Sequence, residues 1–335
     1  MATSLDVRGL TVQLPTRTGW VRPVNDVSFA LGEGESLGIV GESGSGKTML
    51  ALALMGLLPP GARCQGEAWL DVQRADDRNG HSKSSRTNLV TAGSAEMRAL
   101  RGRDIAMIFQ EPMTALNPVV RVGAQVAEAI RVHEASLGAT EIRGRTLHAL
   151  ERASIPDPAM RARQYPHQLS GGLRQRVMIA MALAAGPGVL IADEPTTALD
   201  VTVQKQILEL LGTLRRELRL SLLFITHDLG VVAQIADRVM VMYAGRIVEE
   251  GPTSEVLRHP RHPYTEGLLR AAPRLSREAL ASIPGSVPAL DELPPGCAFA
   301  PRCALHVDKC DVALPELVNV GSADANHRAR CILAK

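Results

Sequence analysis

The sequence lacks a hydrophobic run long enough to cross a membrane. Its longest uncharged run, residues 177–192, contains Gly186-Pro187-Gly188 and falls short of the roughly 20 residues that a spanning helix needs. The first nine residues, Met-Ala-Thr-Ser-Leu-Asp-Val-Arg-Gly, contain no apolar stretch typical of an export signal. We therefore expect a cytoplasmic chain that meets a membrane only through partner proteins.

An excess of charge of one sign is also missing. The chain has 37 Lys and Arg against 35 Asp and Glu, a net charge of +2, and the two signs are mixed along it. No broad basic surface is predicted, so we expect no nucleic-acid partner. At 335 residues the chain can hold one large α/β domain with an appendix.

A glycine-rich segment follows the apolar run at residues 37–40 and precedes a second apolar stretch at 49–58. The segment reads Gly41-Glu42-Ser43-Gly44-Ser45-Gly46-Lys47-Thr48. This order predicts a strand, a phosphate-binding loop and a helix, with backbone N–H groups around the phosphates. Lys47 would face the β- and γ-phosphates, and the Thr48 hydroxyl would ligate Mg²⁺.

A second predicted strand, residues 189–194, ends in the adjacent carboxylates of Asp193 and Glu194. A buried sheet delivers such acids to the edge that faces the phosphates. Asp193 would hold Mg²⁺, and Glu194 would orient or deprotonate the attacking water. Without the glycine-rich loop, a helix N-cap would explain the acidic pair equally well.

Leu169-Ser170-Gly171-Gly172 resembles the signature of ATP-binding cassette (ABC) proteins. The resemblance implies that ATP is the nucleotide and that Ser170, Gly171 and Gly172 cap a helix whose N-terminus meets the γ-phosphate held by a second ABC ATPase subunit. A simple N-cap is the alternative. The family pattern further implies that Gln110 reaches Mg²⁺ or the lytic water and that His227 contacts the γ-phosphate. Asp200 would lie in the loop that crosses the dimer interface.

The family also places an aromatic ring against adenine. Trp20 is the only aromatic residue before Phe29, which fits a core strand. We therefore expect Trp20 to stack on the base, with an exposed hairpin residue as the alternative.

Beyond Gly251 the composition shifts to proline and then to cysteine. Residues 259–265, 283–285 and 296–303, together with 109–118, resemble oligopeptide and dipeptide importer ATPases. Leu173 after the double glycine suggests the D-type subunit, which usually pairs with a different, F-type subunit. The resemblance also implies two membrane permease subunits, an extracytoplasmic substrate-binding protein and a position on the cytoplasmic face of the cell membrane. Proline after His259 and after His262 indicates a rigid turn rather than a metal site.

Four of the five cysteines lie in this tail: Cys297, Cys303, Cys310 and Cys331. In a reducing cytosol, clustered cysteines bind metal more often than they form disulfides. The resemblance implies a [4Fe-4S] cluster, and zinc or unligated thiols are the alternatives. Because the tail follows all the ATP motifs, we expect loss of a cysteine to leave nucleotide binding largely intact. Cys64 stands alone as a packing residue.

The alternation of apolar strands and helices predicts an α/β fold: a P-loop ABC ATPase core with a mainly parallel sheet, an antiparallel β subdomain, a helical subdomain and a small cysteine-rich extension. We expect the nucleotide-binding domain at 1–250, its helical part at about 111–168, and the extension at 251–335 with cysteines at 297–331. Residues 72–94 are polar and aperiodic, which predicts an exposed, mobile excursion.

The predicted function is ATP hydrolysis that powers uptake of di- or oligopeptides or a related small solute. One alternative is a soluble ABC-type ATPase that acts on nucleic acid or ribosomes. Another is a metal-sensing interaction module with a vestigial ATPase, which the presence of both Glu194 and His227 disfavours.

Overall fold

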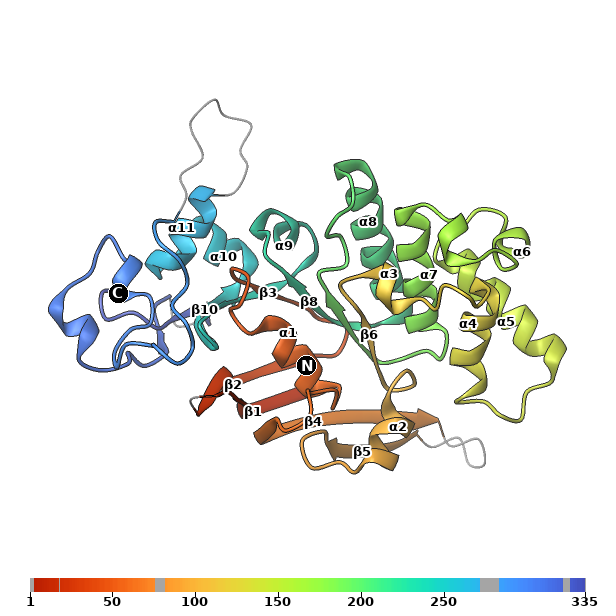
Figure 1. Ribbon diagram of the computed structural model, residues 1–335, viewed down its shortest axis with the longest axis horizontal. Coiled ribbons are helices and arrows are strands. Elements are labelled where there is room, and N and C mark those ends of the chain that lie inside the picture. Colours follow the sequence, from red (N-terminus) through yellow and green to blue (C-terminus); the bar gives the residue numbers. More distant parts are fainter. Residues whose placement is uncertain (1–2, 18, 76–81, 272–282, 322–325, 335) are drawn as a thin grey trace. The chain divides into compact units, whose positions relative to one another are not determined.

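The computed structural model describes residues 3–17, 19–75, 82–271, 283–321 and 326–334 (Figure 1). The chain divides into two compact units that interleave along the sequence. The first unit comprises residues 1–5, 31–35 and 70–223, and the second comprises 6–30, 36–69 and 224–335. Residues on both sides of position 250 belong to the second unit, so the predicted domain boundary there stays a prediction.

The first unit contains short, fully buried parallel strands. β6 (Ile105–Ile108) pairs in parallel with β7 (Val189–Asp193), with Ile105 opposite Val189. On its other side β7 neighbours β8 (Ser221–Thr226), a strand that the two units share. Strands that are buried along their whole length are typical of a parallel sheet covered on both faces, as predicted.

Helices make up most of the rest of the first unit. They are α2 (Ser94–Leu100), α3 (Pro112–Ala115), α4 (Val122–Arg131), α5 (Ala139–Arg152), α6 (Pro158–Arg161), the 3₁₀ helix η1 (Pro166–Gln168), α7 (Gly171–Leu183) and α8 (Val201–Leu218). α4, α5 and α7 pack on one another (Figure 1). Several of these helices lie within residues 111–168, and the bounds of a helical subdomain there stay a prediction. Over the described residues, no helix has both the length and the apolar character needed to cross a bilayer.

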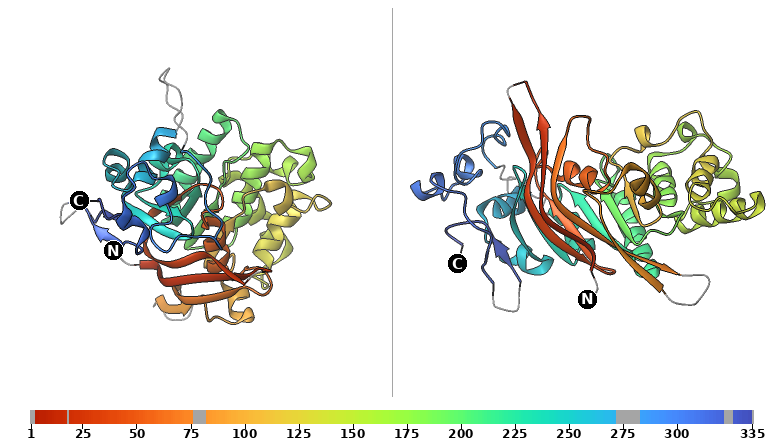
Figure 2. Two further views of the ribbon diagram at one scale, coloured as in Figure 1. Left: turned by 60° about the vertical axis from the view of Figure 1, so that its left-hand side comes forward. Right: turned by 90° about the horizontal axis from the view of Figure 1, so that it is seen from below.

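The second unit contains parts of two sheets. In one, β1 (Thr3–Pro15) lies between β2 (Trp20–Gly32) and β4 (Arg63–Ala75), and Figure 2 shows β1 and β2 as long neighbouring strands. In the other, the order is β11 (Val318–Asn319), β12 (Arg328–Ala329), β10 (Arg246–Pro252), β9 (Arg238–Tyr243), β3 (Ser36–Val40) and then β8. β3 and β9 are parallel, and the pairs from β9 to β11 are antiparallel.

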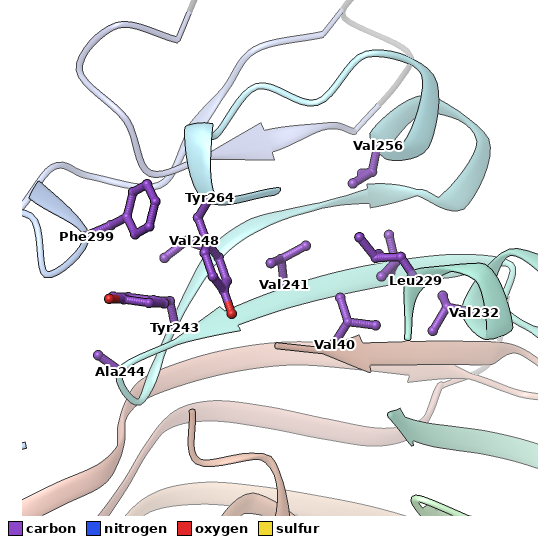
Figure 3. Packing of buried hydrophobic residues seen from close by; sticks show 11 residues of the cluster. Val40, Leu229, Val232, Val241, Tyr243, Ala244, Val248, Val256, Tyr264 and Phe299 are labelled. Atoms are coloured by element: carbon purple, nitrogen blue, oxygen red, sulfur yellow. The ribbon is translucent and has the colours of Figure 1, made fainter. Parts of the chain in front are cut away.

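Short helices complete the second unit. They are α1 (Lys47–Leu54), α9 (Leu229–Ile235), α10 (Thr253–Arg258), α11 (Pro263–Ala271) and the 3₁₀ helices η2 (Ala300–Arg302) and η3 (Asp308–Asp311). A buried cluster joins the strands to the C-terminal segments. Figure 3 shows Tyr243 of β9, Tyr264 of α11 and Phe299 together at one end of this cluster. The C-terminal extension thus shares a core with the strand that neighbours β3.

The stretch at 72–94 differs from the prediction. β4 continues to Ala75, and β5 covers Ser82–Asn88 as the last strand of its sheet. Residues 76–81 lie outside the described residues. Backbone hydrogen bonds between strands do not require apolar side chains, and edge strands are often polar because polar side chains discourage aggregation. The stretch is therefore not an excursion without regular structure, although Ser85 and Arg86 of β5 are exposed as expected.

Candidate functional site

The glycine-rich loop connects β3 to α1 in the second unit, and its backbone leaves no room for side chains at two glycines. A Cβ at Gly41 would lie 2.2 Å from the carbonyl oxygen of Met242, and one at Gly46 would lie 1.9 Å from that of Pro23. Gly46 also has a φ of 104°, and Gly44 has a φ of 80°. Only glycine combines this conformation with so close an approach.

Lys47 is the buried cation of the loop, with 5% of its surface exposed. Its ammonium group donates to the carbonyl oxygens of Gly41 at 2.8 Å and Glu42 at 2.9 Å, and to the Ser45 hydroxyl at 3.2 Å. Thr48, one residue further on, is exposed in the first turn of α1. The carbonyl groups of the loop thus hold the Lys47 ammonium group at the position where the sequence predicts that phosphates bind.

In the first unit, the structure brings together Gln110 and Glu194, which were predicted separately. The Gln110 Nε2 group lies 3.3 Å from Glu194 Oε2, and the Thr197 hydroxyl donates to the same oxygen at 2.8 Å. Glu194 has a φ of 46°, a left-handed conformation that costs a non-glycine residue about 1–3 kcal/mol and is concentrated at functional sites. Asp193, the preceding residue, is 1% exposed. Sequence analysis missed Thr197.

The signature residues stand at the start of α7. Ser170 is the N-cap, and its hydroxyl accepts from the N–H of Leu173 at 3.4 Å. A Cβ at Gly172 would lie 2.7 Å from Val203 Cγ1, so glycine permits the close approach of α8. Asp200 caps α8 by accepting from the Val203 N–H at 2.9 Å. Ser170, Gly171 and Asp200 are exposed. Capping is therefore observed, and the predicted roles across a dimer interface stay predictions.

His227 and Trp20 are exposed residues of the second unit. His227 follows β8 and comes directly before Asp228, the N-cap of α9. Trp20 begins β2 with 44% of its surface exposed, and the Arg63 guanidinium lies 4.0 Å from its ring centroid. This cation–π contact occupies one face of the indole, and stacking of Trp20 on adenine stays a prediction.

The turn at His259 and His262 has a structural explanation. The backbone N–H of His262 donates to the buried carboxylate of Glu249 at 2.9 Å, and its Nδ1 accepts from the Tyr264 N–H at 3.1 Å. Burial lowers the pKa of His262 to about 4. The ring is therefore neutral at physiological pH and supports the start of α11, as the predicted rigid turn requires.

All four tail cysteines line one small cavity, together with His262, Phe299 and several aliphatic side chains. Burial raises the pKa of Cys297 and of Cys303, which favours their neutral thiols. The cavity measures about 20 Å³, roughly enough for one water molecule. Among the residues that the structure describes, no three His, Cys, Asp or Glu side chains are arranged to hold a metal ion. The donor set suits a thiolate-bound metal, but the cavity walls would have to move apart to admit a four-iron cluster, which is thus not confirmed.

Two further residues that sequence analysis missed contact the loop. Tyr264 and Arg302, both from the C-terminal extension, hydrogen-bond to Glu42. Arg302 lies 260 positions away from its partner. Its only signal in the sequence is its place within the importer-like segment at 296–303.

Comparison with known proteins finds a family match for each of two segments of the chain. Residues 24–197 match the ABC transporter family, and residues 248–310 match the C-terminal region of oligopeptide/dipeptide transporters. A Brucella ovis protein, whose name assigns it to peptide import as an ATP-binding protein, is 50% identical over 98% of this chain and 96% of its own length. A similarly named Brucella abortus protein is 48% identical over 91% and 89%.

The solved structures that resemble this chain are also ABC proteins. A dimeric ATP-binding cassette in a post-hydrolysis state with ADP and phosphate is 26% identical, with a TM-score of 0.62 over 74% of this chain and 98% of that one. A component of a Clostridium perfringens ABC transporter complex is 28% identical, with a TM-score of 0.60 over 77% and 92%. The chain belongs to the ABC transporter family, and its residues 248–310 are the C-terminal region of an oligopeptide/dipeptide transporter.

Proposed function

We propose that this chain is the ATP-hydrolysing subunit of an ABC importer for di- or oligopeptides or a related small solute. The observation that carries the proposal is the joining of a complete phosphate loop to a peptide-transporter C-terminal region in one chain. Relatives named for peptide import support it over nearly the full length. These comparisons favour an importer over the nucleic-acid or ribosome alternative.

In this proposal, different residues of the chain bind the phosphates, hold Mg²⁺ and position the attacking water. Lys47 would turn from the loop carbonyls to the β- and γ-phosphates, while loop N–H groups from 41 to 48 surround them. Bound Mg²⁺, held by Thr48, Asp193 and Gln110, would neutralise charge on the phosphate oxygens. Glu194 would orient the attacking water and accept its proton, with Thr197 fixing the direction of the carboxylate. His227 would contact the γ-phosphate.

A second ATPase subunit completes each site in this proposal. The exposed helix N-terminus at Ser170, Gly171 and Gly172 would face the γ-phosphate bound by the partner, and Asp200 would lie at the same interface. A dimeric relative with ADP and phosphate supports this arrangement. The importer assignment implies an F-type subunit as the partner, two permease subunits and a substrate-binding protein. It also implies a place on the cytoplasmic face of the membrane.

We further propose that the tail cysteines bind metal. Four thiols line one cavity and would supply the ligands of a [4Fe-4S] cluster, as the family resemblance implies, with a single zinc ion as the smaller alternative. The metal would stabilise a segment with little apolar core of its own.

The test is reconstitution of the complete transporter in proteoliposomes with labelled peptides and internal ATP. We expect peptide uptake that depends on ATP and stops when Glu194 is replaced by glutamine. ATP hydrolysis without uptake of any peptide would point to another solute, and absence of both hydrolysis and uptake would refute the proposal.

A further inference from the structure

The phosphate loop contains an acidic side chain, which is unexpected in a site for a polyanion. Glu42 is the second residue of the loop, and its carboxylate is 29% exposed. Each phosphate oxygen brought into the loop would be repelled by this carboxylate if it carried its charge without a partner. Something in the second unit must therefore compensate it.

Arg302 of the C-terminal extension supplies that compensation. Its two terminal nitrogens donate to the two Glu42 oxygens, Nη1 to Oε2 at 2.7 Å and Nη2 to Oε1 at 3.0 Å. Such a bidentate pair is the strongest ion-pair geometry that side chains form. The Arg302 side chain is only 4% exposed, so solvent screens the pair poorly, and the hydrogen bonds that Arg302 donates to Glu42 raise the pKa of the guanidinium.

The guanidinium is fixed from several sides. Its Nε donates to the Pro284 carbonyl at 2.9 Å, and Nη2 also reaches the Gly285 carbonyl at 3.3 Å. The rings of Tyr243 and Phe299 each lie 5.9 Å from it. Contacts outside the loop thus fix the position of the Arg302 guanidinium.

Tyr264 adds a second contact to the same loop residue. Its hydroxyl accepts from the Glu42 backbone N–H at 2.7 Å, while the ring is completely buried against Tyr243 at 4.6 Å (Figure 3). The Glu42 carbonyl in turn accepts from Lys47 at 2.9 Å. The extension therefore holds both the charge and the backbone of the residue that anchors the catalytic lysine.

We propose that Arg302 and Tyr264 are positioning residues of the nucleotide site and that the C-terminal extension sets the affinity of the phosphate loop for polyphosphates. Arg302 acts by neutralising Glu42, and Tyr264 by fixing the loop backbone. The inference rests on the proposed function, because it takes the loop as the ATP site. The sequence-based expectation concerned only the loss of a tail cysteine, which it predicted to leave nucleotide binding largely intact, and it foresaw no contact between the extension and the loop.

The test compares the affinity of the purified full-length chain for a fluorescent ATP analogue in four forms. These are wild type, Arg302→Met, the double variant Arg302→Met with Glu42→Gln, and Arg328→Met as a control. Arg328 forms an ion pair with Glu250 elsewhere in the same unit, so its loss removes an arginine–glutamate pair away from the loop. Thermal unfolding verifies that each form is folded.

We expect Arg302→Met to weaken ATP binding about tenfold or more, because Glu42 is left uncompensated, and to weaken AMP binding much less. The added Glu42→Gln change should recover most of the loss, and Arg328→Met should bind like wild type. A purely structural role for Arg302 would instead make the double variant as weak as the single one.

Affinity of Arg302→Met within twofold of wild type, or no recovery in the double variant, would overturn the inference. If Arg302→Met does not fold, Arg302→Lys replaces it in the single and the double variant. Lysine keeps the charge but loses the bidentate geometry, so the single variant should bind ATP more weakly than wild type and the added Glu42→Gln change should recover most of the loss. No recovery would contradict the electrostatic argument. A wild-type chain that binds no ATP would refute the proposed function instead.

Discussion

Replacing Thr197 by valine removes the hydroxyl that directs Glu194 and leaves the shape of the side chain almost unchanged. The hydroxyl donates to Glu194 Oε2 at 2.8 Å, and a hydrogen bond to a charged group contributes about 1.5–3 kcal/mol. Gln110 donates to the same oxygen at 3.3 Å, so the carboxylate keeps one donor and the lower end of the range applies. A loss of about 1.4 kcal/mol in the transition state corresponds to a roughly tenfold slower turnover.

The assay is steady-state ATP hydrolysis by the assembled transporter. We expect Thr197→Val to lower kcat about tenfold with little change in KM for ATP, because the phosphate-binding residues are untouched. Thr197→Ser keeps the hydroxyl and should recover most of the rate. Turnover within twofold of wild type for the valine variant, or an equal loss in the serine variant, would refute the positioning role.

Three other predictions concern the signature, the cysteines and the buried histidine. Ser170→Arg should slow hydrolysis at the partner's phosphate loop more than at this chain's own, which site-specific nucleotide trapping would detect; equal loss at both would contradict it. Anaerobically purified protein should contain iron and sulfide in near-equal amounts, reduced in Cys303→Ser and unchanged in Cys64→Ser; stoichiometric zinc would indicate the zinc site instead. Acidification from about pH 6.5 to pH 4 should lower the free energy of unfolding of the wild type by about 3 kcal/mol more than that of His262→Gln. The reason is that His262 takes up a proton in the unfolded chain over this pH range, whereas the buried imidazole of the folded chain stays neutral. Parallel pH profiles of the two proteins would contradict this.

The sequence was most informative where geometry is local. Glycine at 41 and 46 is dictated by carbonyl oxygens within 2.2 Å of a hypothetical Cβ, so the motif alone predicts the loop. The contact between Gln110 and Glu194 could also be predicted from the sequence, because each residue follows one of two neighbouring parallel strands, β6 and β7. Parallel strands deliver their carboxyl ends to one edge.

Contacts between segments that are distant along the chain could not be predicted from motifs or strand order. The pair of Glu42 and Arg302 spans 260 positions, and no periodicity marks either residue as a partner. Composition also misled at β5, where backbone pairing forms a strand from polar residues. For the cysteines, the sequence predicted a common site, and the structure gathers all four around one cavity without forming a metal-ligating arrangement among the described residues.

The measurement that tests the central claim most directly is ATP turnover and peptide uptake by the reconstituted transporter carrying Glu194→Gln. The amide keeps the size of the side chain but cannot accept the proton of the attacking water. We predict ATP affinity close to that of wild type, hydrolysis slower by at least about a hundredfold, and no peptide uptake. Hydrolysis and uptake near the wild-type rates would contradict the claim that this chain powers import through Glu194.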